Sequence, residues 1–224
     1  MITDIGDEDM KYTALIVAAG SGSRMGLGYN KMLYRFQNGK TILETTVSIF
    51  LKDERCKEVI VVGGKDDIKE YQTILKQDRI VFALGGQTRQ ESVHCGLKKV
   101  TQEYVLIHDG ARPWLTMDCI DHLCQALEEH PACLLMVPVK DTIKQVKDGK
   151  IVTTLNRSEL WQAQTPQAFL TSIILDCHEQ AIQDHIEATD DAQLVELCSS
   201  QSVYVVKGDY ENLKVTTIED IKGR

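Results

Sequence analysis

The chain has 224 residues, of which 43% are hydrophobic, and this length suits one globular domain, 1–224, with a full hydrophobic core. A formal net charge of -8 argues against a general binder of nucleic acid or of membrane surfaces, so any phosphate-binding site must be a local cluster of Arg and Lys. The seven cysteines are scattered without a CxxC pair, no apolar run has transmembrane length and the first ten residues are acidic rather than signal-like. Together these features predict a reduced, cytoplasmic protein with no membrane partner.

In chain order, short apolar runs rich in β-branched residues alternate with amphipathic stretches. The runs predicted as strands are 13–19, 58–63, 79–83, 103–108, 133–138 and 202–206. Two of the helices between them have capping-box spacing at their starts, in Thr41 with Glu44 and in Thr88 with Glu91. Near-continuous apolar strands alternating with helices are typical of a parallel sheet covered on both faces. The sequence therefore predicts an α/β fold with a Rossmann-like, mostly parallel sheet, whose ligands would bind beyond the carboxyl ends of the strands.

The most informative loop follows the first predicted strand and reads AAGSGSRMGLGYNK at 18–31. Its glycines tolerate positive φ and let backbone N–H groups approach an anion closely. Arg24 and Lys31 add fixed positive charge, which suits a triphosphate whose α-phosphorus is attacked. The spacing GxGxxxG differs from the GxGxxG dinucleotide fingerprint, and no Gly-Lys-Ser/Thr sequence marks a Walker A loop. Taken alone, the segment also fits a flexible surface loop with incidental charges.

Two further loops follow strands at the same predicted edge of the sheet. GGQTRQES at 85–92 places two glycines before a capped helix, whose N-terminus could hold an anion or a base edge; the alternative is a simple tight turn. HDGARP at 108–113 places Asp109 and Arg112 after an apolar strand. Asp109 could hold Mg2+ among phosphates while Arg112 grips a substrate, and the alternative is a plain ion pair between these two side chains.

The segment 138–165 interrupts the alternation of strands and helices. An Asp148–Gly149 turn joins two short stretches of alternating pattern, IKQV and IVTTL, which predicts a protruding β-hairpin arm. A two-stranded hairpin is only marginally stable by itself in water, so an arm of this length should pack against something else. The candidates are a second copy of the chain and the arm's own domain.

Together these segments resemble one family across nearly the whole chain, the 2-C-methyl-D-erythritol 4-phosphate cytidylyltransferases of the non-mevalonate isoprenoid pathway. The resemblance rests on AAGSGSRMG with Lys31, GGQTRQES, HDGARP, PVKDTIK, LNRSELWQAQTPQAF, ATDDAQLVE and NLKVT, which occur in the family's order between residues 18 and 216. It implies transfer of CMP from CTP to methylerythritol phosphate, with release of pyrophosphate and with Mg2+ or another divalent cation as cofactor. It also implies a homodimer in which each arm crosses to the partner subunit.

The resemblance also implies roles for single residues at matching positions. Those expected to be catalytic are Arg24, Lys31, Arg157 and Lys214. Those expected to bind CTP are Ala18, Ala19, Gly20, Ser21, Gly22, Gly86, Ser92 and Gly110. Those expected to bind the sugar phosphate are Asp109, Arg112, Thr142, Thr165 and Thr189, and Asp109 is also the candidate metal ligand. Because the attacking phosphate oxygen is ionised at neutral pH, no general base is needed, and catalysis would consist of overcoming repulsion between two anions and holding them in line.

Three positions depart from the family pattern. Asn30 stands where the family commonly has proline before the loop lysine, so no ring locks φ there and Lys31 would be less preorganised. Gln87 replaces an acidic residue often found after the paired glycines. The chain ends at Arg224, soon after the sequence IEDI, where relatives usually continue through a longer final helix.

Other functions remain as alternatives to methylerythritol phosphate transfer. Ribitol-5-phosphate cytidylyltransferases share the fold and CTP, but their first loop usually opens with Leu-Ala-Gly-Gly and their HD-x-x-RP motif has valine where this chain has Ala111. A nucleotide-binding regulator that has lost catalysis would be expected to lack the four cations named above. A dinucleotide-dependent oxidoreductase is disfavoured by the loop spacing. The sequence therefore favours methylerythritol phosphate as the acceptor.

Overall fold

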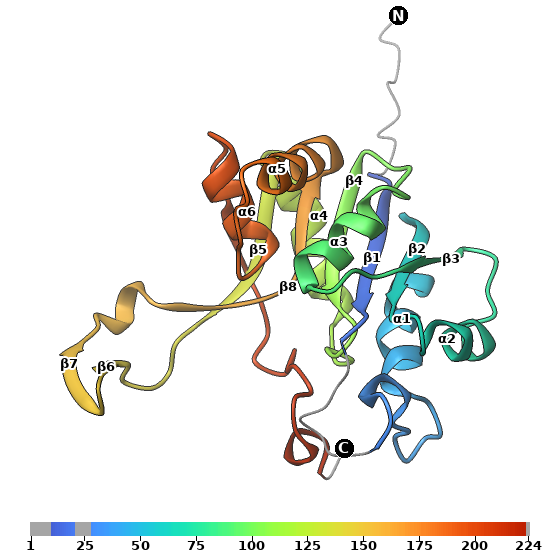
Figure 1. Ribbon diagram of the computed structural model, residues 1–224, viewed down its shortest axis with the longest axis horizontal. Coiled ribbons are helices and arrows are strands. Elements are labelled where there is room, and N and C mark those ends of the chain that lie inside the picture. Colours follow the sequence, from blue (N-terminus) through green and yellow to red (C-terminus); the bar gives the residue numbers. More distant parts are fainter. Residues whose placement is uncertain (1–9, 21–27, 223–224) are drawn as a thin grey trace, which may run out of the picture.

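The computed structural model describes residues 10–20 and 28–222, and its framework is a mixed sheet with helices on both faces (Figure 1). The strands of this sheet are β1 (Tyr12–Ala18), β2 (Cys56–Gly63), β3 (Ile80–Leu84), β4 (Tyr104–Asp109), β5 (Ala132–Pro138), β8 (Trp161–Leu170) and β9 (Tyr204–Lys207). They lie in the order β3-β2-β1-β4-β8-β5-β9. All pairs are parallel except those that β8 forms with β4 and β5. The predicted mostly parallel α/β sheet is confirmed.

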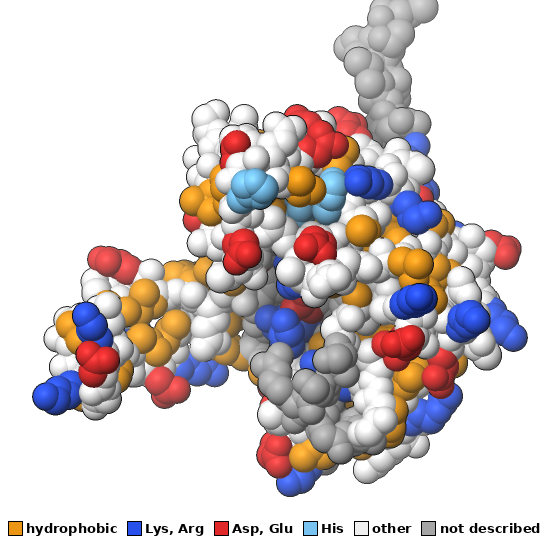
Figure 2. Space-filling model, in the orientation of Figure 1, with side chains coloured by type: hydrophobic (Ala, Val, Ile, Leu, Met, Phe, Trp, Pro, Cys, Tyr) orange, Lys and Arg blue, Asp and Glu red, His pale blue; other side chains and the backbone are white. Residues whose placement is uncertain are grey.

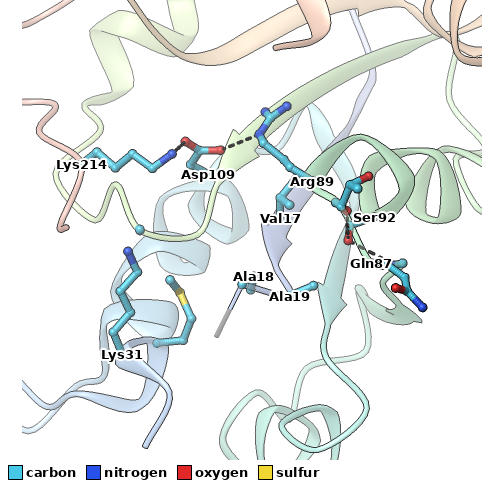
Figure 3. Close-up of a pocket in the computed structure, with 14 residues that line it drawn as sticks. Val17, Ala18, Ala19, Lys31, Gln87, Arg89, Ser92, Asp109 and Lys214 are labelled. Atoms are coloured by element: carbon cyan, nitrogen blue, oxygen red, sulfur yellow. Dashed lines mark hydrogen bonds and ion pairs between the residues drawn. The ribbon is translucent and has the colours of Figure 1, made fainter. Parts of the chain in front are cut away.

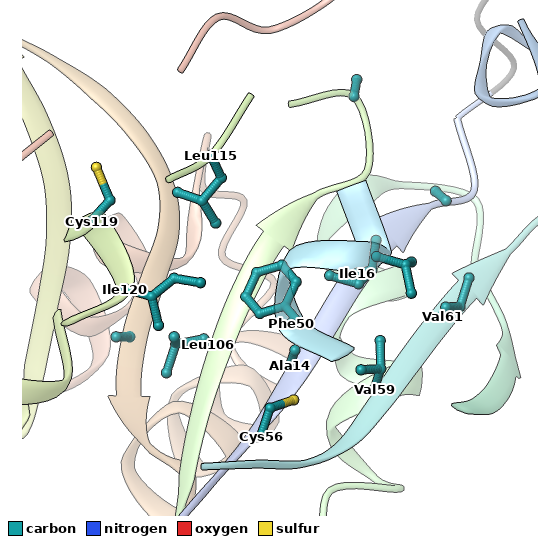
Figure 4. Packing of buried hydrophobic residues seen from close by; sticks show 14 of the residues in the cluster. Ala14, Ile16, Phe50, Cys56, Val59, Val61, Leu106, Leu115, Cys119 and Ile120 are labelled. Atoms are coloured by element: carbon teal, nitrogen blue, oxygen red, sulfur yellow. The ribbon is translucent and has the colours of Figure 1, made fainter. Parts of the chain in front are cut away.

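Six α-helices pack on the two faces of this sheet. They are α1 (Ile42–Lys52), α2 (Ile68–Ile74), α3 (Arg89–Leu97), α4 (Met117–Leu127), α5 (Thr171–Gln183) and α6 (Asp191–Cys198). Successive side chains of a strand point to opposite faces, so Ile16 of β1 lies in the hydrophobic layer that includes α1, α2 and α4, whereas Leu15 lies in the layer that includes α3, α5 and α6. Figure 4 shows the first of these layers, with Phe50 and Ile120 from the helices among side chains of β1, β2 and β4. Burial on both faces explains why the strands read as continuous apolar runs.

The parallel arrangement brings the ends of several strands to one edge. β1 lies between β2 and β4, and the register pairs Val17 of β1 with Asp109 of β4 and Ala18 of β1 with Gly63 of β2. The loops that follow these strands therefore start side by side, although they are far apart in the sequence. This edge is where ligands bind in open parallel sheets.

The central antiparallel strand β8 was not predicted from the sequence. Residues 161–165, which the sequence analysis assigned to the arm, form its first half. Its buried stretch is unusually polar, and the buried amides have partners: Gln164 Nε2 donates to Asp209 O at 2.8 Å and Gln167 Nε2 donates to Asp190 Oδ2 at 2.9 Å. Because the segment is polar and contains Pro166, it has no apolar run of the kind that predicts a strand.

The predicted β-hairpin forms between β5 and β8. It consists of β6 (Lys144–Lys147) and β7 (Lys150–Thr154), and both Asp148 (φ 51°) and Gly149 (φ 75°) have the positive φ that a type I′ turn requires. A short 3-10 turn, η3 (Arg157–Glu159), follows it. The hairpin projects away from the sheet (Figure 1), and Figure 2 shows hydrophobic side chains gathered along it. Val146, Ile151 and Val152 are 57%, 65% and 59% exposed.

The two predicted capping boxes have different outcomes. At α1 the box is complete, because Thr41 Oγ1 accepts from Glu44 N while Glu44 Oε2 accepts from Thr41 N at 2.7 Å. At α3 only half of the box forms. Thr88 Oγ1 accepts from Glu91 N, but the Glu91 carboxylate accepts from Gln87 N, one residue further back, at 2.6 Å. The second prediction was therefore wrong in its reciprocal bond.

The seven cysteines all lie in the described part of the chain. Cys56, Cys119, Cys124, Cys133 and Cys177 are buried, Cys95 and Cys198 are partly buried, and all seven are free thiols. Within the described residues, we find no helix with the length and apolar character needed to cross a membrane.

Candidate active site

A pocket of about 360 Å³ opens at the carboxyl edge of the sheet, between the ends of β1 and β4 and the start of α3 (Figure 3). Eight of the predicted site residues line it: Ala18, Ala19, Gly20, Lys31, Gly86, Ser92, Asp109 and Lys214. They come from four separate parts of the chain. The structure thus brings together the loops that the sequence analysis placed at one edge.

The first wall is the end of β1 and the turn that carries Lys31. Lys31 begins the 3-10 turn η2 (Lys31–Leu33), is 8% exposed, and donates from Nζ to Val215 O at 2.7 Å. In Figure 3 its side chain points up toward the end of β4. Of the glycines in this loop, Gly28 has a positive φ of 73°. Ser21, Gly22 and Arg24 lie outside the described residues, so their predicted roles stay predictions.

Asn30 stands directly before Lys31, where the family commonly has proline. Its φ is -66°, the value that a proline ring would impose, although no ring is present. Asn30 is 6% exposed and caps η2 with its side chain. The backbone before Lys31 therefore has the φ that a proline would impose, and here it is accompanied by the side-chain cap of Asn30.

The second wall is the turn between β3 and α3. Gly86 N donates to Ser92 Oγ at 3.2 Å, and Ser92 Oγ donates to Thr88 O at 2.8 Å. A Cβ at Gly86 would clash with the side chain of Glu91. The glycine is therefore needed for the close approach of the loop to the first turn of α3.

Asp109 lines the pocket and lies between two cations. Its Oδ2 pairs with Lys214 Nζ at 2.7 Å, and its Oδ1 pairs with Arg89 Nε at 3.3 Å (Figure 3). Burial opposes ionisation, but the charges of Arg89 and Lys214 outweigh it and hold the pKa of Asp109 well below its usual range. Arg112, which the alternative interpretation paired with Asp109, instead donates from Nη1 to Asn212 O at 2.6 Å.

Arg89 is the main site residue that the sequence analysis missed. Its Nη1 also pairs with Asp191 Oδ2 at 2.9 Å, and Asp191 Oδ1 contacts His178 Nε2 at 3.3 Å. Burial lowers the pKa of Arg89, but the carboxylates of Asp191 and Asp109 raise it by more, so the guanidinium stays charged. In the sequence, the feature that could have indicated Arg89 is its place in the first turn of a helix that follows two glycines.

The segment 212–215 closes the pocket on the side of Lys214. Asn212 is completely buried and donates from Nδ2 to Thr165 O at 2.9 Å, while Val215 N donates to Ala111 O at 2.8 Å. These bonds hold the segment to β8 and to the loop after β4. The ammonium of Lys214 is thereby held over Asp109 although its side chain is 40% exposed.

Gly110 and Thr165 lie behind the pocket wall, among buried hydrogen bonds. Gly110 N donates to Val17 O at 2.9 Å, and Gly110 O accepts from Thr46 Oγ1 at 2.8 Å. Thr165 Oγ1 accepts from Asp109 N at 3.0 Å and contacts His108 Nδ1 at 3.0 Å. Both residues support the loop after β4, and neither is among the residues that line the pocket. Their roles in binding ligand stay predictions.

The remaining predicted site residues lie away from the pocket of their own chain. Thr142 and Arg157 are exposed on the arm, where Arg157 Nη1 donates to Lys140 O at 2.8 Å. Thr189 lies between α5 and α6 and bonds to Gln193 through both N and Oγ1. In Figure 1 the arm extends to one side of the sheet, far from the end of β1.

The described lining residues favour an anionic ligand. Three of them are cationic, Lys31, Arg89 and Lys214, and one is acidic, Asp109. Within the described part of the chain we find no group of three or more His, Cys, Asp or Glu side chains that could hold a metal ion. Mg2+ is usually bound by one or two carboxylates together with substrate phosphates, so the single ionised carboxylate of Asp109 fits that mode of binding.

Comparison with known proteins points to one family. The sequence profile of the family 2-C-methyl-D-erythritol 4-phosphate cytidylyltransferase matches residues 12–223. The enzyme of that name from Halalkalibacterium halodurans is 44% identical over 217 residues, covering 95% of this chain and 94% of the relative. The one from Bacillus licheniformis is 41% identical over 217 residues, covering 95% of this chain and 93% of the relative.

Solved structures agree with the sequence comparison. The fold is similar to the crystal structure of 4-diphosphocytidyl-2C-methyl-D-erythritol synthase from Anaerococcus prevotii, with a TM-score of 0.84, 34% identity, and 96% and 94% of the two chains covered. It is also similar to the 2-C-methyl-D-erythritol 4-phosphate cytidylyltransferase of Francisella tularensis, with a TM-score of 0.83, 29% identity, and 95% and 97% of the two chains covered.

Proposed function

The chain belongs to the 2-C-methyl-D-erythritol 4-phosphate cytidylyltransferase family, and from this membership we propose how its pocket and arm carry out the reaction. It is a nucleotidyltransferase that transfers CMP from CTP to methylerythritol phosphate in isoprenoid synthesis. One P–O bond forms between the acceptor phosphate and the α-phosphorus, the bond from the α-phosphorus to the β-phosphate breaks, and pyrophosphate leaves. The relatives named above favour this acceptor over ribitol 5-phosphate.

The observation that carries the site assignment is the cluster of cations at the carboxyl edge of the sheet. Lys31 and Lys214 lie in the pocket together with Ala18, Gly86 and other residues expected to bind CTP. We place the triphosphate beside the end of β1, with Lys31 and Arg24 neutralising the negative charge that grows at the α-phosphorus. Lys214 neutralises the phosphates from the other side. The acceptor phosphate is already an anion, so the site needs fixed charge and alignment rather than a base.

A divalent cation would be held by Asp109 and by the phosphates themselves. When bound, it supplies further positive charge that offsets repulsion between CTP and the acceptor. Asp109 stays ionised because its pKa is held well below the usual range. Lys214 pairs with Asp109 in this structure, and its 40% exposed side chain would turn toward phosphate oxygens once CTP is bound. Arg89 stays on the other carboxylate oxygen and keeps Asp109 in place.

The acceptor site is completed by the arm of a second subunit. Thr142 and Arg157 lie exposed on the arm, which projects away from the sheet of its own chain (Figure 1). The exposed side chains of Val146, Ile151 and Val152 give the arm an apolar surface that a partner subunit would cover. We therefore assign the active form as a homodimer in which each arm brings Thr142 and Arg157 to the partner's pocket.

A pyrophosphate-release assay tests these assignments. We expect turnover with CTP and methylerythritol phosphate, and much less with ATP, GTP or UTP or with ribitol 5-phosphate as acceptor. Turnover with ribitol 5-phosphate alone would contradict the acceptor. Lys31→Ala and Arg24→Ala should each lower kcat by at least ~100-fold, the scale for loss of a contact made in the transition state. Lys76→Ala, at an exposed position after α2, is the charge-matched control and should keep wild-type kcat.

A further inference from the structure

Both the oxygen and the nitrogen of the Asn30 side-chain amide form hydrogen bonds within the protein. Its Oδ1 accepts from Met32 N at 3.1 Å, and its Nδ2 donates to Gly20 O at 3.0 Å and to Asp67 Oδ2 at 2.7 Å. Only one orientation of the amide satisfies all three partners, because one partner is a donor and two are acceptors. Asn30 itself is 6% exposed; its bond from Met32 N is buried, and its bonds to Gly20 and Asp67 are partly buried.

The three bonds join three separate elements at the edge of the pocket. Gly20 follows β1 and lines the pocket, Met32 lies in the turn that begins with Lys31, and Asp67 is the N-terminal cap residue of α2. The end of β1 and the turn of Lys31 form two sides of the same cavity. A single amide thus sets the position of Lys31 relative to the backbone that is expected to bind CTP.

We propose that Asn30 is a positioning residue, whose side-chain amide holds Lys31 against the α-phosphate site while it also fixes the backbone of Gly20. The amide acts through Lys31 and touches no reacting atom. Its φ of -66° and its cap of η2 orient the start of the turn, and its two donated bonds fix that turn to β1 and α2. This inference rests on the proposed catalytic role of Lys31.

Steady-state kinetics of CMP transfer with three variants tests the proposal. Asn30→Ala removes all three bonds and should lower kcat by roughly 10-fold to 100-fold, because misplacement of a catalytic group by about 1 Å can cost that much. Asn30→Asp keeps the acceptor for Met32 N but sets a carboxylate against Asp67, and should lose a similar factor. Asn30→Pro imposes the native φ without a side chain, and should turn over at least about threefold faster than Asn30→Ala.

A cycle with Lys31→Ala separates positioning from a general loss of folded protein. In the Lys31→Ala background, Asn30→Ala should lower kcat by less than about twofold, since the catalytic group that it positions is already gone, and loss of the bond to Gly20 should appear in the KM for CTP. Asn38→Ala is the matched control, because Asn38 caps a turn through Lys40 N at 3.0 Å on the exposed surface, and it should keep wild-type kcat.

Two results would overturn the proposal: wild-type kcat in Asn30→Ala, or an equal loss from Asn30→Ala with and without Lys31. A wild-type kcat in Lys31→Ala would instead refute the catalytic role given to Lys31, whatever Asn30 does. The two failures are therefore distinguishable in one set of assays.

Discussion

At the scale of single residues, His108 defines the hydrogen bonding beneath the pocket. Its Nε2 lies 3.1 Å from Arg112 O, which can only accept, so Nε2 must carry the proton. Nδ1 of the neutral ring then accepts from the Thr165 hydroxyl, whose oxygen accepts from Asp109 N. The hydroxyl proton of Thr165 is thus already donated to His108. Toward a sugar, Thr165 can therefore act only as a hydrogen-bond acceptor or make contact through its methyl group.

The buried neutral imidazole predicts a pH dependence of stability. Burial lowers the pKa of His108 from 6.5 to about 4. Between pH 6.5 and pH 4, His108 is protonated in the unfolded chain but stays neutral in the folded chain. The free energy of unfolding therefore falls as the pH drops through 6.5, and it levels off below pH 4. From pH 7 to pH 5 we expect His108 to account for a loss of about 2 kcal/mol, measured by urea unfolding at each pH.

The matched variant for this measurement is His108→Gln, whose amide can still donate to Arg112 O but does not titrate. It should be less stable than the wild type at pH 7, yet lose about 2 kcal/mol less between pH 7 and pH 5. The difference between the two chains removes the contribution of His94, whose pKa burial also lowers. Parallel pH profiles for the two chains would contradict the assigned protonation state.

The sequence predicted the charged residues that line the candidate site at the ends of loops, and it missed those defined by contacts across the fold. Lys31, Asp109 and Lys214 follow apolar runs, so their place at the strand ends was predictable. The roles of three other residues depend on partners that are distant in the sequence and that the topology of the sheet brings close. These pairs are Arg89 with Asp191, His108 with Thr165, and Asn212 with Arg112. No local pattern encodes such pairs.

At the scale of elements, the capping box of α1 is a local stabiliser that can be measured. Thr41 is buried and makes both reciprocal bonds with Glu44. Thr41→Ala should lower the free energy of unfolding by about 1 kcal/mol or more, the usual cost of losing a helix N-cap. Thr41→Ser keeps the hydroxyl and should recover most of that loss, as followed by urea unfolding at pH 7.

A second threonine cap gives the comparison for this prediction. Thr116 of α4 is exposed, accepts from Cys119 N at a long 3.4 Å, and has no acidic residue to complete a box. Thr116→Ala should therefore cost less than Thr41→Ala. If Thr41→Ser were as unstable as Thr41→Ala, the loss would come from packing of the threonine methyl group rather than from the cap.

The strand β8 marks the limit of what the sequence pattern could predict about the fold. The apolar strands were predictable because both of their faces are buried in hydrophobic layers. In β8, Gln164 and Gln167 are buried only because Asp209 and Asp190 supply hydrogen bonds from distant segments. A strand whose burial depends on such partners has no apolar run, and its first half, 161–165, lies within the arm predicted at 138–165.

At the scale of the whole molecule, the arm divides the predicted active site between two places in one chain. The cationic pocket lies at the edge of the sheet, while Arg157 lies on the projecting segment (Figure 1). An isolated hairpin of this kind is marginally stable, and its exposed valine and isoleucine side chains gain stability when covered. A two-fold dimer can complete both sites at once, because each subunit gives its arm to the other.

Mixed dimers test whether the arms cross. A Lys31→Ala chain and an Arg157→Ala chain should each be nearly inactive as homodimers, the first through kcat and the second through weak binding of methylerythritol phosphate. If the arms cross, a purified mixed dimer has one site with an intact pocket and an intact arm, and should show about half the wild-type rate. If each arm serves its own chain, every site of the mixed dimer carries one defect and no activity returns. Differently tagged chains allow the mixed dimer to be isolated, and re-purified homodimers exclude recovery by subunit exchange.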